Sequence, residues 1–195
     1  MATRDATSDL ADVRAHGRVL LVSMRRESKR NAIDRAMADA LGAAFNRLED
    51  DDEIWAGVLA ANGPVFSAGS DLTANGDYVT ERGGEYGLVR RRRRKPLVVA
   101  VDGPALGGGM ELVLACDMVV ASRRATFGLP EVAIGVVPTC GALFRAPRAL
   151  PVNLARELVL TGDPIPAERA YAAGFVNALC ASGEATERAV ALAAR

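Results

Sequence analysis

The run PLVVAVDG at residues 96–103 constrains the fold more than any other part of the sequence. Successive side chains of a strand point to opposite faces of a sheet, and nearly all of these side chains are apolar. A strand that is apolar on both faces belongs in a sheet that is covered on both sides. Residues 19–24, 55–61 and 117–122 are also apolar runs and are predicted to be strands.

Helices are predicted between and after these strands. Asp34 is suited to cap the first helix, in which Met37, Leu41, Phe45 and Leu48 recur every three or four residues and form one apolar face. Further helices are predicted from Gly107 to about Cys116, in the late 80s up to Pro96, and at residues 140–149, 152–161, 166–173 and 184–194. Because strands alternate with helices, we expect an α/β fold.

The connections are rich in glycine, proline or charge. Residues 62–72 and 130–138 are predicted to be loops, and residues 73–87, with four glycines, a mobile loop. The acidic segment EDDDE at residues 49–53 has two interpretations. Consecutive carboxylates can bind a cation, but they usually form a solvated connection between a helix and a strand, and we favour that interpretation.

Composition excludes several classes of function. The 195 residues are half apolar, one quarter charged and neutral overall, so one core is expected, without attraction to nucleic acid or membranes. No apolar run is long enough to cross a bilayer. Residues 1–16 are polar, do not resemble a signal peptide, and are expected to form a loose segment before a core domain at residues 17–195.

Histidine and cysteine usage narrows the chemistry further. His16 is the only histidine, which argues against histidine-based triads and multi-histidine metal sites. Cys116, Cys140 and Cys180 are odd in number and have no metal-ligand or redox spacing. We therefore expect reduced, buried thiols in a cytoplasmic protein, with no metal site.

The segment ALGGGMEL at residues 105–112 is the strongest candidate for a site. A helix that begins after glycines offers unpaired N–H groups, and no Cβ prevents a ligand from approaching them. The segment matches neither dinucleotide-binding nor P-loop spacing, which leaves an oxyanion hole with Glu111 nearby to handle protons. The alternative is purely structural: the glycines permit tight packing, and Glu111 caps the helix.

Four motifs together resemble the enoyl-CoA hydratase/isomerase (crotonase) family. They are FSAGSDL, GPALGGGMELVLACD, FGLPEVAIGVVP and LTGDPIPAERAYAAGFVN, which occur in the family's order and at about its spacing. The resemblance covers roughly residues 17–180 and implies a crotonase-like spiral of ββα units. It also implies an acyl-CoA thioester substrate and a homotrimer or a dimer of trimers. No cofactor is implied, since coenzyme A is part of the substrate.

The resemblance assigns roles to particular residues. The backbone N–H groups of Ser70 and Gly108 would form the oxyanion hole, and Glu111 and Glu131 would act on water and on the acyl chain. By this analogy Glu111 activates water and Glu131 protonates C2. The residues expected to line the coenzyme A site are Lys29, Arg30, Ala32, Ala68, Asp71, Leu72, Gly107 and Pro130.

Two features depart from the family pattern. Family members continue beyond a stretch like residues 184–195 into further helices, so the C-terminal helical part is expected to be truncated, which would weaken substrate binding. The run RRRRRK at residues 90–95 has three interpretations. The run could form a solvated helix end, a basic surface that attracts the phosphates of coenzyme A, or an RNA-binding surface.

The resemblance favours enoyl-CoA hydratase, because both glutamates are present. The alternatives are a double-bond isomerase or another acyl-CoA thioester enzyme of the family, and a non-catalytic coenzyme A- or RNA-binding relative. Nucleic acid is the less favoured partner, given the neutral net charge and the single tryptophan. Neither acyl chain length nor oligomeric state follows from the sequence.

Overall fold

The computed structural model describes residues 9–74, 76 and 78–195. Its central sheet has six strands in the order β1-β2-β3-β6-β8-β11. The strands are β1 (Ala11–His16), β2 (Val19–Met24), β3 (Ala56–Ala61), β6 (Leu97–Val101), β8 (Met118–Ser122) and β11 (Ala178–Cys180). Only the β1–β2 pair is antiparallel, and every other neighbouring pair is parallel.

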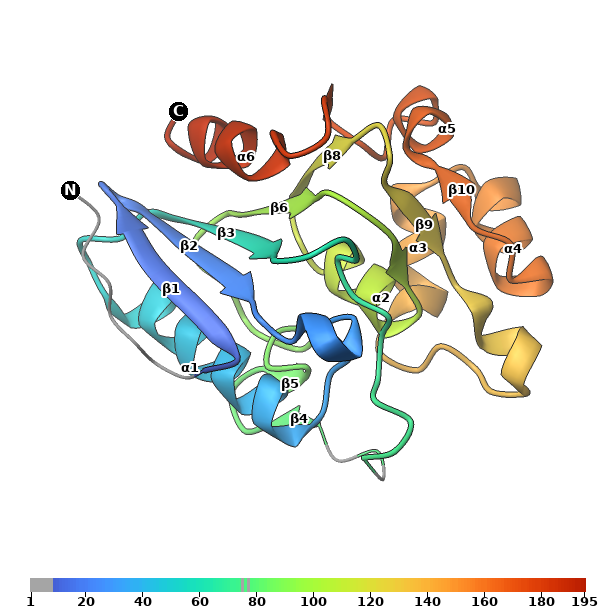
Figure 1. Cartoon of the computed structure of the whole chain (residues 1–195), viewed down its shortest axis with the longest axis horizontal. Coiled ribbons are helices and arrows are strands. Elements are labelled where there is room, and N and C mark those ends of the chain that lie inside the picture. Colours follow the sequence, from blue (N-terminus) through green and yellow to red (C-terminus); the bar gives the residue numbers. More distant parts are fainter. Residues whose placement is uncertain (1–8, 75, 77) are drawn as a thin grey trace.

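Two smaller sheets lie beside the central one (Figure 1). The first pairs β10 (Ile165–Pro166), β9 (Thr126–Gly128) and β7 (Ala105–Leu106), and the second pairs β4 (Val79–Thr80) with β5 (Gly84–Glu85). The α-helices are α1 (Arg35–Asp50), α2 (Gly108–Leu114), α3 (Ala142–Ala149), α4 (Val152–Thr161), α5 (Ala167–Ala172) and α6 (Ala185–Ala193). Two 3₁₀ helices are η1 (Glu27–Lys29) and η2 (Pro130–Ile134).

Helices cover both faces of the central sheet, as the apolar run in β6 predicts (Figure 1). All five residues of β6 are buried. Helix α6 packs against β3, β6 and β8 on one face, and α1 packs against β1 and β2 on the other. Asp34 caps α1 by accepting a hydrogen bond from the Met37 N–H at 2.9 Å. The predicted α/β class, and the four strands and six of the seven helices predicted, are confirmed, with ends shifted by a few residues.

The expectation of a loose segment up to His16 is wrong for its second half. Residues 11–16 form the edge strand β1, paired with β2 along its whole length. Ala11 and Val13 are buried at alternate positions, which is the pattern of a strand with one face on the core. The polar residues between them, Asp12 and Arg14, concealed that alternation. Residues 1–8 lie outside the described part of the chain.

The prediction of a helix in the late 80s that ends before Pro96 is also wrong. Gly84, Tyr86 and Gly87 have φ angles of +65°, +57° and +72°, which a right-handed helix does not allow. Residues 73–87, predicted to be a mobile loop, contain the β4–β5 hairpin, while residues 75 and 77 lie outside the described residues. Gly87 is forced to be small, because a Cβ there would lie 2.5 Å from the Gly42 nitrogen in α1.

The arginine run at residues 90–95 is therefore not a helix end. Arg93 pairs with Asp117 at 2.5 Å, and Arg94 donates its backbone N–H to Glu49 at 2.9 Å. The Arg91 guanidinium donates to Asn46 in α1 at 2.7 Å. These contacts attach the segment that precedes β6 to α1 and to the start of β8. They support a structural role for the run, by ion pairs rather than by a helix dipole.

The acidic segment at residues 49–53 ends α1 and begins the connection to β3. Glu49 is buried, and Asp50 pairs with Arg82 in the β4–β5 hairpin at 2.5 Å. Among the described residues, no cluster of His, Cys, Asp and Glu is suited to hold a metal ion. Nor is any helix in the described part of the chain long and apolar enough to cross a membrane.

Candidate active site

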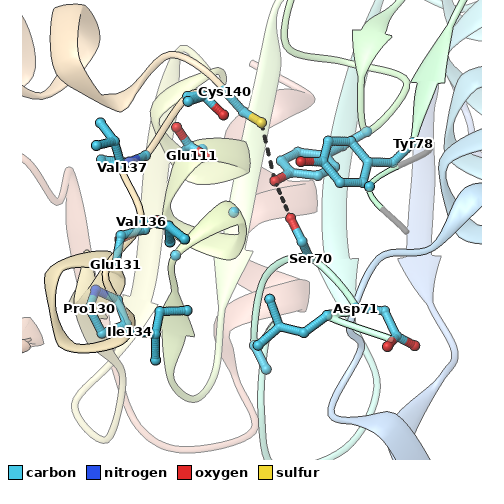
Figure 2. Close-up of a pocket in the computed structure, with 18 of the residues that line it drawn as sticks. Ser70, Asp71, Tyr78, Glu111, Pro130, Glu131, Ile134, Val136, Val137 and Cys140 are labelled. Atoms are coloured by element: carbon cyan, nitrogen blue, oxygen red, sulfur yellow. Dashed lines mark hydrogen bonds between the residues drawn. The ribbon is translucent and has the colours of Figure 1, made fainter. Parts of the chain in front are cut away.

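A cavity of about 650 Å³ brings together segments that are far apart in the sequence. Its walls come from the loop after β3, the start of α2, η2 with the loop that follows it, and the β4–β5 hairpin (Figure 2). Ser70, Gly108, Glu111 and Glu131 all line it. The structure thus places the four residues predicted to carry the chemistry around one space.

Ser70 has its backbone N–H available for a ligand. Residues 33 and 70 form an isolated parallel bridge in which the Ile33 N–H donates to Gly69 O and the Asp71 N–H donates to Ile33 O. In such a bridge the N–H of the central residue points away from the partner strand. Within the described residues, the Ser70 N–H has no hydrogen-bond acceptor.

Gly108 is the first residue of α2, so its N–H is one of those that a helix leaves unpaired. Gly107 precedes it with φ +54°, a left-handed angle that glycine adopts without a steric penalty. Gly69 lies directly against this turn, since a Cβ on Gly69 would lie 2.8 Å from the Gly108 nitrogen. The glycines therefore bring the Ser70 loop and the start of α2 into contact.

Glu111 lies in the first turn of α2 and is 2 % exposed. Its Oε1 accepts a hydrogen bond from the Ala142 N–H at 3.1 Å, which fixes the carboxyl group against the start of α3. Burial raises the pKa of Glu111 to about 7, although the Ala142 N–H opposes this shift. The charge of Glu131 also contributes to the rise. Glu111 can therefore gain or lose a proton near neutral pH.

Glu131 belongs to η2, where Pro130 occupies the first turn. Its carboxyl group lies over the glycine turn, because a Cβ on Gly107 would lie 3.3 Å from Glu131 Oε1. Burial raises the pKa of Glu131 as well. Its Oε2 is buried and has no hydrogen-bond partner among the described residues. The two carboxyl groups thus share one cavity in which at least one proton is favoured.

The raised pKa of Glu111 predicts a pH-dependent stability difference between the protein and its Glu111→Gln variant. The folded protein holds the Glu111 proton more tightly than the unfolded chain, so its stability falls as pH rises from about 4.5 to about 7. Glutamine keeps the hydrogen bond to Ala142 but cannot ionise. We expect the variant to gain up to about 3 kcal/mol relative to the wild type between pH 4.5 and pH 8.

Urea unfolding at these two pH values measures the effect. The Glu187→Gln variant, at an exposed position in α6, is the control and should change stability by less than about 0.5 kcal/mol at either pH. A difference between wild type and Glu111→Gln that does not change with pH would show that Glu111 has an ordinary pKa in the folded protein.

Five of the eight residues predicted to bind coenzyme A line the cavity: Ala68, Asp71, Leu72, Gly107 and Pro130. Leu72 is highly exposed at the rim. The carboxylate of Asp71 is bound by Thr73 of the same loop and by the guanidinium of Arg26. The Thr73 hydroxyl and N–H, and then Arg26, lower its pKa to about 2. Arg26 pairs with Asp71 at 2.8 Å, so this carboxylate carries little uncompensated charge.

Lys29, Arg30 and Ala32 do not line the cavity. Lys29 is the last residue of η1, and Arg30 and Ala32 follow it. The backbone of this segment supports the site. Arg30 O accepts a hydrogen bond from the Ala68 N–H at 3.0 Å, and Ala32 O accepts one from Arg26 at 2.8 Å. No residue of the arginine run at 90–95 lines the cavity either.

One wall of the cavity consists of residues that were not predicted from the sequence. It contains Tyr78 and Tyr86 from the hairpin, and Cys140 from the loop before α3 (Figure 2). The tyrosine rings contact each other, with centroids 4.9 Å apart. The available signal was that two of the three tyrosines fall in one glycine-rich segment. The opposite wall is apolar and includes Ile134, Val136 and Val137, each about half exposed.

Comparisons with known proteins match both the sequence and the structure. The sequence profile of the enoyl-CoA hydratase/isomerase family matches residues 14–195. A carnitinyl-CoA dehydratase from Salmonella typhi is 38 % identical over 185 residues, which is 91 % of this chain and 70 % of that protein.

Solved structures of similar proteins have the same fold as this chain. A carnitinyl-CoA hydratase from Mycobacterium avium superposes with a TM-score of 0.92 at 40 % identity, covering 97 % of this chain and 75 % of that one. The enoyl-CoA hydratase EchA1 from Mycobacterium marinum has a TM-score of 0.92 at 42 % identity, with 96 % and 75 % covered.

Proposed function

Because this chain belongs to the enoyl-CoA hydratase/isomerase family, we propose that it is an enoyl-CoA hydratase that adds water reversibly to a trans-2-enoyl-CoA. The product is the corresponding 3-hydroxyacyl-CoA. One observation carries the proposal: two buried glutamates with raised pKa values, Glu111 and Glu131, line the same cavity as two unpaired N–H groups.

The N–H groups of Ser70 and Gly108 are proposed to bind the thioester oxygen. Negative charge accumulates on that oxygen when a nucleophile adds to the conjugated double bond. Fixed N–H donors that face it therefore stabilise the transition state more than the substrate. They need little reorganisation during the reaction, because the Ser70 loop and the start of α2 pack directly against each other at Gly69.

Glu111 and Glu131 are proposed to divide the proton transfers. Ionised Glu111 takes a proton from water as the water oxygen bonds to C3, and the π electrons move into the enolate. Protonated Glu131 then delivers its proton to C2, which restores the thioester carbonyl. The cycle ends with Glu111 protonated and Glu131 ionised, and one proton passes between them or through solvent to restore the starting state.

Hydration of crotonyl-CoA by the purified chain tests this proposal. The reaction removes the conjugated double bond, so the ultraviolet absorbance of the enoyl thioester should decline and 3-hydroxybutyryl-CoA should accumulate. Mass spectrometry would show a gain of one water. Conversion of a 3-enoyl-CoA to a 2-enoyl-CoA, without gain of water from either substrate, would identify a double-bond isomerase instead.

A carnitinyl-type substrate is the second candidate, and a specific observation favours it. Two of the relatives above are named for carnitinyl-CoA, whose acyl group carries a quaternary ammonium. Among the described residues that line the cavity none is basic, while Glu111, Glu131 and two tyrosines are present. Such a wall tolerates a cation better than an anion.

Comparing crotonyl-CoA with its 4-trimethylammonio derivative tests the second candidate. A higher kcat/KM for the charged substrate would support it. A kcat/KM at least tenfold higher for crotonyl-CoA would assign the cavity to uncharged acyl chains. Both outcomes leave the hydration chemistry in place.

A further inference from the structure

Among the described residues, Tyr86 is the largest fully buried side chain, and it contacts both proposed oxyanion segments. Its hydroxyl shares a hydrogen bond of 2.7 Å with Ser70 Oγ (Figure 2). The same hydroxyl lies against Gly108, since a Cβ added there would collide with it. One side chain thus touches both residues that are proposed to supply the oxyanion-hole N–H groups, although these come from different segments.

The backbone of Tyr86 is held in a conformation that a non-glycine residue rarely adopts. Its φ is +57°, in the left-handed region that favours glycine. Strain of this kind persists only where the surroundings enforce it. The Tyr86 N–H donates to Tyr78 O at 2.9 Å, and Gly87 packs directly on α1. The tyrosine is therefore anchored by the hairpin and α1, independently of the two segments that it contacts.

A third contact joins Cys140 to the same hydroxyl. Cys140 Sγ donates to the Tyr86 hydroxyl at 3.2 Å (Figure 2). Because the hydroxyl accepts from Cys140, its own proton is free to be donated to Ser70 Oγ. Cys140 also lies two residues before Ala142, whose N–H binds Glu111. Tyr86 is the common partner of the Ser70 loop, the start of α2 and the loop that orients Glu111.

We propose that Tyr86 is a positioning residue that fixes the Ser70 and Gly108 N–H groups at the separation a thioester oxygen requires. It acts through the hydrogen bond to Ser70 and through contact with Gly108, and it does not touch the reacting carbons. This inference rests on the proposed function, because it takes the two N–H groups as an oxyanion hole.

Tyr86→Phe tests the hydroxyl while keeping the ring. The ring contacts with Tyr78 and Gly108 remain, but the bonds to Ser70 and Cys140 are lost. We expect kcat for crotonyl-CoA to fall about 10- to 100-fold with KM within about twofold, because misplaced donors lose transition-state contacts first. Tyr171→Phe, on the exposed surface of α5, is the matched control and should leave both constants unchanged.

A double-mutant cycle separates positioning from a general loss of stability. Ser70→Ala removes the same hydrogen bond from the other end but keeps the backbone N–H. If Tyr86 acts through Ser70, the two losses in kcat are not additive, and the double variant resembles either single one. Additive losses, or a wild-type kcat in Tyr86→Phe, would overturn the inference. If Tyr86→Phe does not fold, a wild-type kcat in Ser70→Ala would overturn it equally.

A binding measurement distinguishes this inference from the proposed function. Acetoacetyl-CoA is a thioester that cannot be hydrated, and its enolate form would use the same two N–H groups. Calorimetric titration should show about tenfold weaker binding to Tyr86→Phe than to the wild type, and equal binding of free coenzyme A, which has no carbonyl at this position. If Tyr86→Phe weakens acetoacetyl-CoA binding as expected but the wild type does not hydrate crotonyl-CoA, only the hydratase proposal would be refuted. Hydration without the binding difference would refute the role of Tyr86.

Discussion

Replacing Glu131 with glutamine is expected to lower kcat for crotonyl-CoA hydration about 10³-fold. The change keeps the shape of η2 and its place over Gly107, but it removes the proton that C2 must receive. KM should change little, since the thioester and the coenzyme A contacts are unaffected. Initial rates from the loss of enoyl absorbance measure both constants.

Glu49→Gln is the matched control for Glu131→Gln. Glu49 is also a buried glutamate, but it lies in α1, outside the cavity, and holds the Arg94 N–H. Glutamine can accept that same hydrogen bond, so the control should keep wild-type kcat. A Glu131→Gln variant within threefold of the wild type would show that Glu131 is not the acid, and the mechanism proposed above would be wrong.

The pH dependence assigns the two glutamates to their roles. With Glu111 as base and Glu131 as acid, kcat/KM should have a bell-shaped pH dependence, which rises where the base loses its proton. It should fall again where Glu131 loses the proton that it delivers. The two apparent pKa values belong to the interacting pair. If Glu131→Gln removed the rising limb and left the falling limb, the roles would be reversed.

The sequence predicted the site best where its chemistry depends on the local backbone. Gly107 to Glu111 occupy one turn at the start of α2, so their spacing alone places a free N–H and a carboxylate close together. Glu131 could be joined to them only through the family resemblance, because it reaches the cavity from η2. Its proximity depends on how the segment after β9 packs over the glycine turn.

Tyr86 shows why the rest of the site was hidden. Its backbone is left-handed and its side chain is buried, and the next residue, Gly87, packs against Gly42, which is far away in the chain. Nothing in the local pattern around residue 86 indicates that contact, and the sequence predicts instead a helix that ends in the arginine run before Pro96. Those arginines lie outside any helix or strand and bind carboxylates of other segments, such as Asp117, which only the fold brings near.

Substituting alanine for Gly108 is expected to lower kcat about 10²- to 10³-fold, the effect of losing one oxyanion donor. The N–H itself remains, but a Cβ at this position collides with the Tyr86 hydroxyl and lies 2.7 Å from its Cζ. Either the ring or the first turn of α2 must move, and both movements displace the N–H from the thioester oxygen. Steady-state kinetics with crotonyl-CoA measure the loss.

Gly174→Ala separates this effect from the general cost of replacing a glycine. Gly174 has φ +81° and open space around it, away from the cavity, so alanine there is strained but meets no neighbour. The control should lose about 1–2 kcal/mol of unfolding free energy and keep wild-type kcat. Gly108 lies at the start of a right-handed helix, so alanine there should lose activity chiefly by displacing the donor. If Gly108→Ala retained full activity, its N–H would not be the second donor, and the glycine turn would serve only to pack α2 against the Ser70 loop.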